Sequence, residues 1–277
     1  MSHLPRRIGP IVLAVALLVT LVPTAAATDD LTVEQAEAKV ATLLNQQRTS
    51  AGRIVLRVDA RLSAIARARS EDMATKGYFA HQQPDGDWAW DLMTAAGIRW
   101  YGAGEIIAWN SWPTLADSAT AASKQWHDSS AHHALLTSAS YNYFGVGLAV
   151  DGSGKKLWTV VFIKGPDRTG ARAKFRTSSN IAPDSLSTAS TSTARRAMTI
   201  RWSGSDVRLQ VLTAGLKYFQ VQVRREGVYD WRYTKSATTN TSMVRNLLKG
   251  RVYQFRIRAK DKAGNYGRWS STLWIRP

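Results

Sequence analysis

A stretch without any hydrophobic pattern divides this chain and limits the folds open to it. From Thr177 to Thr193 the residues are mostly serine, threonine and alanine with one proline, which is the composition of a flexible linker. We assign residues 168–196 to this linker. The segments on either side, 28–167 and 197–277, are each of a size that one hydrophobic core can support. The sequence therefore predicts two separately folded units.

The two halves differ sharply in charge. Residues 28–167 carry 13 lysines and arginines against 15 acidic residues, whereas residues 168–277 carry 22 against 5, a net charge of +17. Such an imbalance attracts polyanions over a screening length of about 8 Å at physiological salt. We expect residues 168–277 to meet an anionic cell-envelope polymer or an anionic membrane surface. The sequence has no motif that reads bases, so sequence-specific nucleic-acid binding is not expected.

The first 27 residues have the three parts of a secretory signal peptide. Arg6 and Arg7 precede the apolar run 11–22, and three small residues ending at Ala27 follow. The apolar run is shorter than the roughly 20 residues that cross a bilayer, which favours cleavage after Ala27 over a membrane anchor. The chain has no cysteine, which excludes thiolate chemistry and favours bacterial export. We expect a secreted protein that associates with the cell wall.

Residues 28–167 predict an α+β domain. Thr32 with Gln35 resembles a capping box at the start of one amphipathic helix, and Asp59 can cap a second helix. Helical spacing recurs further along, at Leu115, Ala119, Ala122 and Trp126. Two strand-like runs close the segment, at 144–150 and 157–163. Helices followed by a sheet define an α+β unit.

Residues 197–277 have the pattern of short alternating strands separated by turns. The clearest strands are 199–202, 219–225 and 252–259. About 80 residues with this pattern predict an all-β sandwich. Arg256, Arg258 and Lys260 share one face of the last strand, which is the ordinary pattern of a charged solvent face.

A series of short motifs runs through residues 35–165. In order they are Leu44-Asn45 with Arg48, then Leu56, Asp59, Leu62 and Ala66, Phe79-Ala80-His81, Pro84-Asp85-Gly86, Gly104-Glu105, Trp126-x-x-Ser129-x-x-His132 and Gly145-Val146-Gly147. In this order and spacing they resemble the CAP superfamily, which includes cysteine-rich secretory proteins and plant pathogenesis-related proteins. The resemblance implies an α-β-α sandwich with a cleft.

The C-terminal segment resembles a bacterial fibronectin type III domain. The matching positions are Trp202–Asp206, Tyr253, Asp261–Asn265 and Trp269–Ser270. This resemblance implies a fold and says little about function. The complete prediction is an α-β-α sandwich CAP domain, a linker, and an all-β fibronectin type III-like sandwich.

The CAP resemblance also implies a metal site. In several members of the superfamily two histidines and acidic residues line the cleft and bind a divalent metal, and the matching positions here are His81, His132 and Glu105. This chain has Ser129 where animal and plant members have a second acid, and Ile106 where an asparagine is common. These two departures mean that a four-ligand site should not be assumed. Zinc or another divalent metal is the expected cofactor, with no organic cofactor.

Two roles remain open for these three side chains. Ser129 is expected to cap a helix over 130–136, which places His132 in the first turn, where the helix dipole favours a neutral imidazole. A neutral imidazole can bind Zn²⁺. Glu105 is then a third metal ligand, or the candidate catalytic group that activates a metal-bound water. The alternative is a buried hydrogen-bonded network that holds the cleft together.

Structural roles are expected for the other notable residues near the cleft. Ser129 is expected to cap its helix rather than act as a nucleophile, because no third member of a catalytic triad is placed beside it. His127 and His133 are expected on the solvent side. Five tryptophans between Trp88 and Trp112 either form a wall for an apolar or glycan ligand or fill the core.

Two functions are consistent with these features. The first is an exported binding protein whose cleft holds a divalent metal or a small ligand, and whose basic β-sandwich retains it at the cell envelope. The second is a metal-dependent hydrolase that acts on peptide or cell-envelope material. Ser129 in place of an acid favours the binding function.

Overall fold

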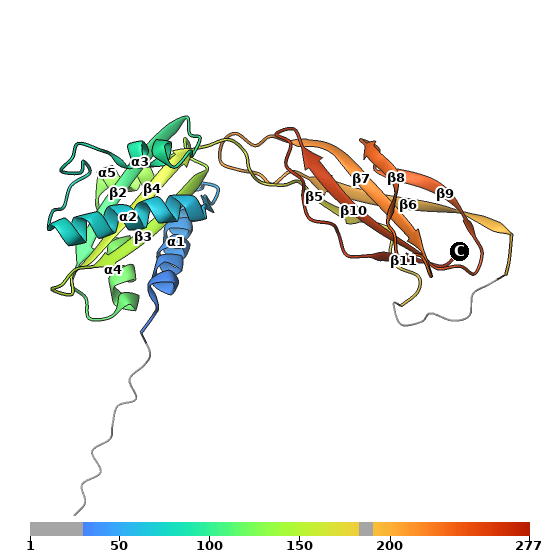
Figure 1. The fold of residues 1–277 in the computed structure, drawn as a ribbon, viewed down its shortest axis with the longest axis horizontal. Coiled ribbons are helices and arrows are strands. Elements are labelled where there is room, and N and C mark those ends of the chain that lie inside the picture. The colour runs from blue at the N-terminus through green and yellow to red at the C-terminus, as the bar shows by residue number, and fades with distance from the viewer. Residues whose placement is uncertain (1–29, 183–190) are drawn as a thin grey trace, which may run out of the picture. The chain divides into compact units, whose positions relative to one another are not determined.

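A computed structural model of the chain describes residues 30–182 and 191–277 (Figure 1). The predicted signal peptide lies outside these residues. The helices of the N-terminal part are α1 (Val33–Ser50), α2 (Ala60–Lys76), α3 (Ala89–Ala95), α4 (Leu115–Asp128) and α5 (Ser130–Leu136). In the described ranges, no helix has both the length and the apolar character needed to span a bilayer.

The strands of the N-terminal part form one sheet in the order β1-β3-β4-β2. They are β1 (Arg57–Val58), β2 (Gly102–Asn110), β3 (Tyr143–Val150) and β4 (Lys156–Lys164). β3 and β4 form an antiparallel hairpin over the two predicted runs, and β2 lies antiparallel to β4 on its other side. β1 pairs in parallel with only the first two residues of β3. Strand β2 falls in the tryptophan-rich stretch, where the sequence pattern predicts no strand.

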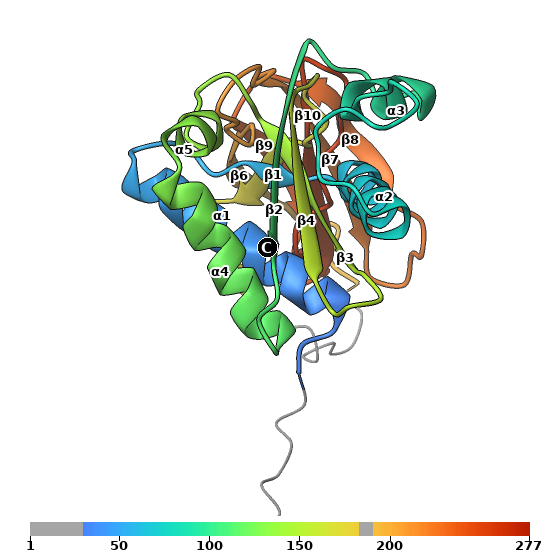
Figure 2. The same cartoon turned by 90° about the vertical axis from the view of Figure 1, so that its left-hand side faces the viewer.

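Helices cover both faces of this sheet (Figure 2). On one face α1, α4 and α5 pack over a core that includes Leu44, Trp126 and Trp158. On the other face α2 and α3 pack over a core that includes Leu62 and Met93. This arrangement is the predicted helix-sheet-helix sandwich, and it places β2 and β4 between two hydrophobic layers.

The predicted helix starts are confirmed. The Thr32 side chain accepts a hydrogen bond from the Gln35 N–H, and the Gln35 side chain accepts one from the Thr32 N–H, which completes a capping box at α1. Asp59 caps α2 by accepting from the Arg61 N–H at 3.0 Å. These caps satisfy backbone donors that would otherwise lack partners at each helix start.

Two glycines let α2 pack directly against β3. A Cβ atom at Gly145 would lie 2.1 Å from the Ser63 backbone nitrogen, and one at Gly147 would lie 2.1 Å from the Arg67 backbone nitrogen. Any larger residue would therefore push the helix away from the sheet. The Gly-x-Gly motif thus sets the depth of α2, the helix that also carries Arg69 of the functional site.

The C-terminal part consists of two sheets that enclose a second hydrophobic core. Its strands are β5 (Arg172–Phe175), β6 (Arg195–Ser205), β7 (Leu216–Arg225), β8 (Arg232–Thr238), β9 (Ser242–Leu248), β10 (Tyr253–Asp261) and β11 (Leu273–Ile275). One sheet has the order β11-β10-β7-β8 and the other β5-β6-β9. Trp202, Phe219 and Phe255 are among the buried residues between them.

The linker expected over 168–196 needs correction at both ends. Residues 172–175 form β5, which pairs antiparallel with β6, and β6 begins at Arg195 instead of after 196. Asn180 also bonds to the last strand region, since its side chain donates to the Arg276 carbonyl and accepts from the Arg276 N–H. The first strand of the C-terminal part, β5, therefore lies ahead of the serine- and threonine-rich stretch.

Replacing Gly147 by alanine should destabilise the protein by about 1–3 kcal/mol, because the added methyl group meets the α2 backbone, which cannot rotate away. Gly152→Ala is the matched control, since a Cβ there has nothing within 4 Å. Urea unfolding followed by tryptophan fluorescence measures both free energies of unfolding. Equal stabilities for the two variants would contradict the proposed close approach.

Candidate functional site

Glu105 lies at the centre of the site, on β2, with both carboxylate oxygens occupied. Its Oε1 accepts a hydrogen bond from Arg69 Nε at 3.1 Å, and its Oε2 lies 2.7 Å from His81 Nδ1. The Glu105 and Arg69 side chains are almost completely buried, so this ion pair is shielded from water. The structure therefore brings together two of the three predicted site residues and adds a third, Arg69, that the sequence motifs did not single out.

Arg69 donates four hydrogen bonds within the site. Besides Glu105, its Nη1 donates to the Tyr78 hydroxyl at 2.7 Å, and its Nη2 donates to the carbonyls of Ala80 and His81 at 2.8 and 2.9 Å. These carbonyls belong to the loop that carries His81. A single guanidinium from α2 thus fixes both the acidic side chain and the backbone of the histidine loop.

The network continues from Tyr78 to the surface. The Tyr78 hydroxyl donates to Asp72, which also pairs with Lys76 at 2.7 Å. Burial raises the pKa of Tyr78, and the neighbouring Asp72 raises it further. Burial also acts to raise the pKa of Asp72, but the hydrogen bonds from Lys76 and Tyr78 outweigh it and lower that pKa. The Tyr78 phenol therefore stays protonated and links the buried and exposed ends of the network.

The contact with Glu105 fixes the tautomer of His81. An ionised carboxylate can only accept, so His81 Nδ1 is the donor in this contact and Nε2 is the ring nitrogen left for another partner. The His81 side chain is 43% exposed, which leaves it within reach of solvent and ligands. A carboxylate behind a histidine in this way is the usual partner of an imidazole that binds metal.

His132 lies close to His81. It sits half-buried on α5, and its pKa is lowered chiefly by burial and further by the charge that His81 can carry. The predicted neutrality of His132 thus has a different main cause from the helix dipole. Both effects favour the neutral form of His132, which keeps a lone pair on its ring.

Ser129 and His133 differ from their expected roles. Ser129 is the N-cap residue of α5, as predicted, but its side chain makes no capping hydrogen bond. His133 is half-buried rather than solvent-facing, and its ring meets that of the exposed His127 edge to face at 4.9 Å. Its Nδ1 is buried without a hydrogen-bond partner among the described residues.

A pocket of about 540 Å³ opens beside His132. Its lining includes Phe79, Trp109, Gln125 and Ser129, and half-exposed aromatic rings contribute to its wall. The five tryptophans that the sequence groups together have separate roles. Trp109 lines this pocket, whereas Trp88 and Trp90 stack on each other at 4.7 Å.

The three predicted metal ligands do not converge as a complete site. In the described part of the chain, the group whose ligand atoms all lie within 4.8 Å of one another is Asp167, Asp206 and Asp261, not His81, Glu105 and His132. Glu105 is fully engaged by Arg69 and His81. Of the three residues, Glu105 is therefore the least available to a metal ion, and a metal site on His81 and His132 stays a prediction.

The three aspartates were not identified from the sequence; Asp206 and Asp261 belong to the C-terminal part, and Asp167 precedes it but bonds to its loops. Asp167 accepts from the N–H groups of Thr169 and Ala214, both at 2.8 Å. Asp261 accepts from the backbone and side chain of Asn265 at 2.7 and 2.8 Å. These carboxylates already accept hydrogen bonds from neighbouring loops, so the contacts indicate a structural role.

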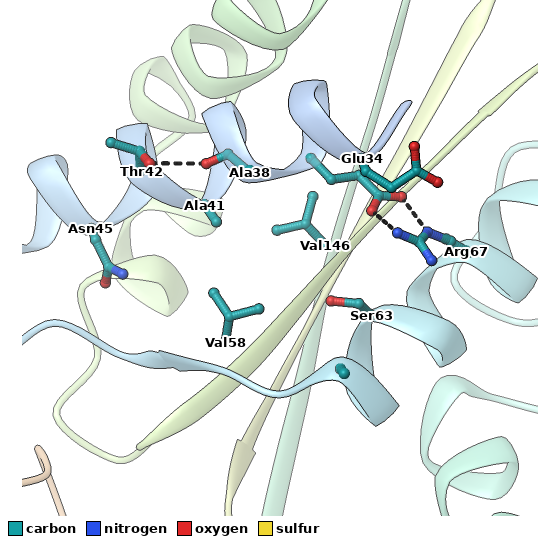
Figure 3. Close-up of a pocket in the computed structure, with 11 residues that line it drawn as sticks. Glu34, Ala38, Ala41, Thr42, Asn45, Val58, Ser63, Arg67 and Val146 are labelled. Carbon is teal, nitrogen blue, oxygen red and sulfur yellow. Dashed lines mark hydrogen bonds and ion pairs between the residues drawn. The ribbon is translucent and has the colours of Figure 1, made fainter. Parts of the chain in front are cut away.

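A second pocket, of about 480 Å³, lies between α1 and α2 (Figure 3). Glu37 on α1 bonds Arg67 on α2 at 2.7 Å through Arg67 Nε, and it also accepts from the Leu148 N–H at 3.2 Å. The Arg67 side chain points toward the acidic end of this pocket in Figure 3. Glu37 thereby covers part of the edge of β3 that β1 leaves unpaired.

Comparison with known proteins identifies the domain that carries this site. Residues 41–162 match the CAP family, described as the Cysteine-rich secretory protein family. The Bacillus subtilis protein YkwD is 35% identical over 127 residues, which is 46% of this chain and 46% of YkwD. The N-terminal part of the chain therefore contains a CAP domain. The chain spans about half the length of this relative.

Solved structures of three bacterial proteins each match over 50% of this chain. An outer surface protein of Borrelia burgdorferi is 13% identical, with a TM-score of 0.44 over 98% of its length. An extracellular protein of Bacillus anthracis that contains an SCP domain is 24% identical, with a TM-score of 0.41 over 45% of its length. A cysteine-rich secretory protein of Staphylococcus aureus is 13% identical, with a TM-score of 0.37 over 41% of its length.

Acidification should destabilise the protein through His132. Because the pKa of folded His132 is lowered, the unfolded chain takes up a proton near pH 6.5 whereas the folded chain does so only at lower pH. The free energy of unfolding should therefore fall as the pH drops below about 6.5 and should be insensitive to this group above that value. His132→Gln should lose that part of the pH dependence.

Urea unfolding between about pH 7.5 and pH 5 tests this expectation. The difference in slope between wild type and His132→Gln isolates the histidine from the other titrating groups. His127→Gln is the control, since that side chain is exposed. Parallel pH profiles for wild type and His132→Gln would contradict the assignment.

Proposed function

We propose that this is an exported binding protein whose CAP cleft holds a divalent metal ion on His81 and His132. The observation that carries the proposal is the 2.7 Å contact between Glu105 and His81 Nδ1, with Arg69 on the other carboxylate oxygen. These contacts hold the His81 ring by Nδ1 and leave Nε2 as the nitrogen that can bind a metal ion. It supports a role in binding through a preset imidazole rather than through the carboxylate.

Two imidazoles and water suit an exchangeable zinc or similar ion better than a closed structural site, which needs four protein ligands. When bound, the ion supplies a Lewis acid at the edge of the pocket beside His132. The protein's own groups hold that position: Glu105 orients His81, Arg69 fixes Glu105, and burial keeps His132 neutral. The apolar wall that includes Phe79 gives space for a small ligand next to the ion.

The hydrolase alternative receives less support from the same contacts. A hydrolase needs a group that takes a proton from the attacking water. Glu105 was the candidate for this role, but both of its oxygens already accept hydrogen bonds from neighbouring side chains. Ser129 stands where an acid would offer a second carboxylate. We therefore favour binding over catalysis.

For the C-terminal part, we propose a fibronectin type III-like sandwich that retains the protein at the cell envelope. The pairing of a four-stranded with a three-stranded sheet supports the fold. So does Tyr253, whose hydroxyl accepts from the Leu248 N–H at 3.1 Å, as in a tyrosine corner. A net charge of +17 over residues 168–277 supports retention by an anionic polymer or membrane surface.

Isothermal titration with Zn²⁺ tests the metal proposal. The protein without its signal peptide should bind one ion per chain. His81→Ala and His132→Ala should each weaken binding at least tenfold, because each removes one of only two protein donors. His127→Ala is the matched control, and its affinity should equal that of wild type because the side chain is exposed and outside the donor pair. Unchanged uptake by the His81→Ala/His132→Ala double variant would rule out this site.

Co-sedimentation with purified cell-wall material tests retention. Binding should be strong at low salt and should fall steeply as the salt concentration rises, since exposed charges separated by more than a screening length no longer interact. Removing the anionic polymers from the wall should abolish binding. Retention that is indifferent to salt would show that the basic charge is not the cause.

A further inference from the structure

The outer face of the β11-β10-β7-β8 sheet carries a row of cations stacked between aromatic rings. We call this row the cationic ladder. Its members are Arg224, Arg256, Arg258 and Lys260, alternating with Trp231, Trp269, Tyr266 and Tyr218. Each of the three guanidinium groups lies 4.2–4.6 Å from the centroid of a ring that it covers. Strands β7 and β10 therefore present their positive charges as an ordered array, with each guanidinium held against aromatic rings.

A second row of side chains beneath the ladder fixes the direction of each guanidinium. Nε of Arg256 donates to Gln222, and Nε of Arg258 donates to Gln220, both at 2.7 Å. These glutamines are at least 92% buried and carry no charge. They hold the inner edge of each guanidinium, and the terminal nitrogens of Arg256 and Arg258 make no hydrogen bond within the described residues.

The ladder has no counter-charge of its own. Among the residues that the structure describes, none of its four cations forms an ion pair with a carboxylate. Burial lowers the pKa of Arg256, and the neighbouring Arg224 and Arg258 lower it further, which reflects the mutual repulsion of the row. A bound anion would relieve this repulsion. In the N-terminal part, by contrast, Arg67 and Arg69 both have glutamate partners.

The ladder's spacing and chemistry indicate what kind of anion fits. Alternate residues on one face of a strand lie about 7 Å apart. A polymer with a phosphate on each short repeat can offer its charges at a similar interval. Guanidinium groups bind phosphate through two parallel hydrogen bonds, and the free outer edges of Arg256 and Arg258 are suited to such contacts.

The aromatic rings argue against recognition of bases. Single-stranded nucleic acids bind by stacking bases on exposed aromatic faces. Here Trp231 lies under Arg224 and Arg256, and Trp269 lies under Arg256 and Arg258. With guanidinium groups on their faces, these indole rings support cations and have little free area for a base.

We propose that the cationic ladder binds a polyol-phosphate polymer of the cell wall through its phosphodiester groups. This inference rests on the proposed retention at the envelope. It assigns that retention to the outer face of the β11-β10-β7-β8 sheet. Arg256 and Arg258 provide the central phosphate contacts, and Arg224 and Lys260 extend the row at its two ends. The polymer is recognised by its backbone charge and spacing, with no requirement for a particular sugar or base.

Binding of a synthetic poly(glycerol phosphate) to the chain without its signal peptide tests this proposal. Arg256→Gln/Arg258→Gln should weaken binding at least tenfold. It should also lower the slope of log affinity against log salt by roughly 1.4, the value for two lost phosphate contacts on a flexible strand. Arg201→Gln/Arg245→Gln is the matched control. It removes the same charge from exposed positions on β6 and β9 and should weaken binding less than threefold.

Three results would overturn the proposal. One is equal weakening by the ladder and control variants, which would assign binding to net charge alone and leave retention at the envelope intact. Another is no binding of the polymer by a wild-type protein that still sediments with cell walls. The third is tighter binding of single-stranded DNA or anionic lipid vesicles than of the polymer. Loss of wall retention by wild type in low salt would instead count against the proposed function itself.

A conservative pair of substitutions distinguishes a loss of binding from a loss of folding. Arg256→Lys/Arg258→Lys keeps both charges and removes the planar fork, so its affinity should lie between those of wild type and the glutamine variant. Near-ultraviolet circular dichroism reports whether the tryptophans of the ladder stay ordered. A lysine variant that is folded and binds as tightly as wild type would contradict the role of the guanidinium forks.

Discussion

The buried guanidinium of Arg69 is the interaction on which the CAP-domain site depends. A charge without access to water is costly unless it is paired and hydrogen-bonded. Arg69 meets this condition with the carboxylate of Glu105, the hydroxyl of Tyr78 and two loop carbonyls. Removing any one partner leaves another polar group unsatisfied. The position of His81 is therefore set by the same contacts that join α2 to β2, and the site is part of the framework.

Local sequence patterns predicted the helix starts and the β3–β4 hairpin because short-range contacts determine them. Thr32 and Asp59 cap their helices with groups two or three residues away. Motif order predicted that His81 and Glu105 are neighbours, and the two side chains are in contact at 2.7 Å. Arg69 could not be found in this way. An arginine within a charged helix looks like a surface residue until the loop that covers it is known.

Prediction from the sequence had a similar limit in the C-terminal part. Alternation along 252–259 predicted one strand with charges on one face, but not that aromatic residues from other segments would lie between them. That arrangement depends on the register of β7 against β10, which pairs Arg256 with Gln222 and Arg258 with Gln220, and on the loop that contains Tyr266 and Trp269. Strand β5 was missed because its four residues are too few to establish a period of two.

The uncharged glutamines beneath the ladder have a consequence for how the two halves respond to their surroundings. Arginine stays protonated throughout the physiological range and glutamine does not titrate, so the charge of the ladder is constant with pH. His132 instead gains a proton on acidification, at a pH that burial lowers below its usual value, and then has no lone pair to offer. Under the proposed function, acid releases the metal from the cleft and leaves the charge of the ladder unchanged, whereas salt screens that charge. The proposed functions of the N-terminal and C-terminal parts are thus sensitive to different conditions, the first to pH and the second to ionic strength.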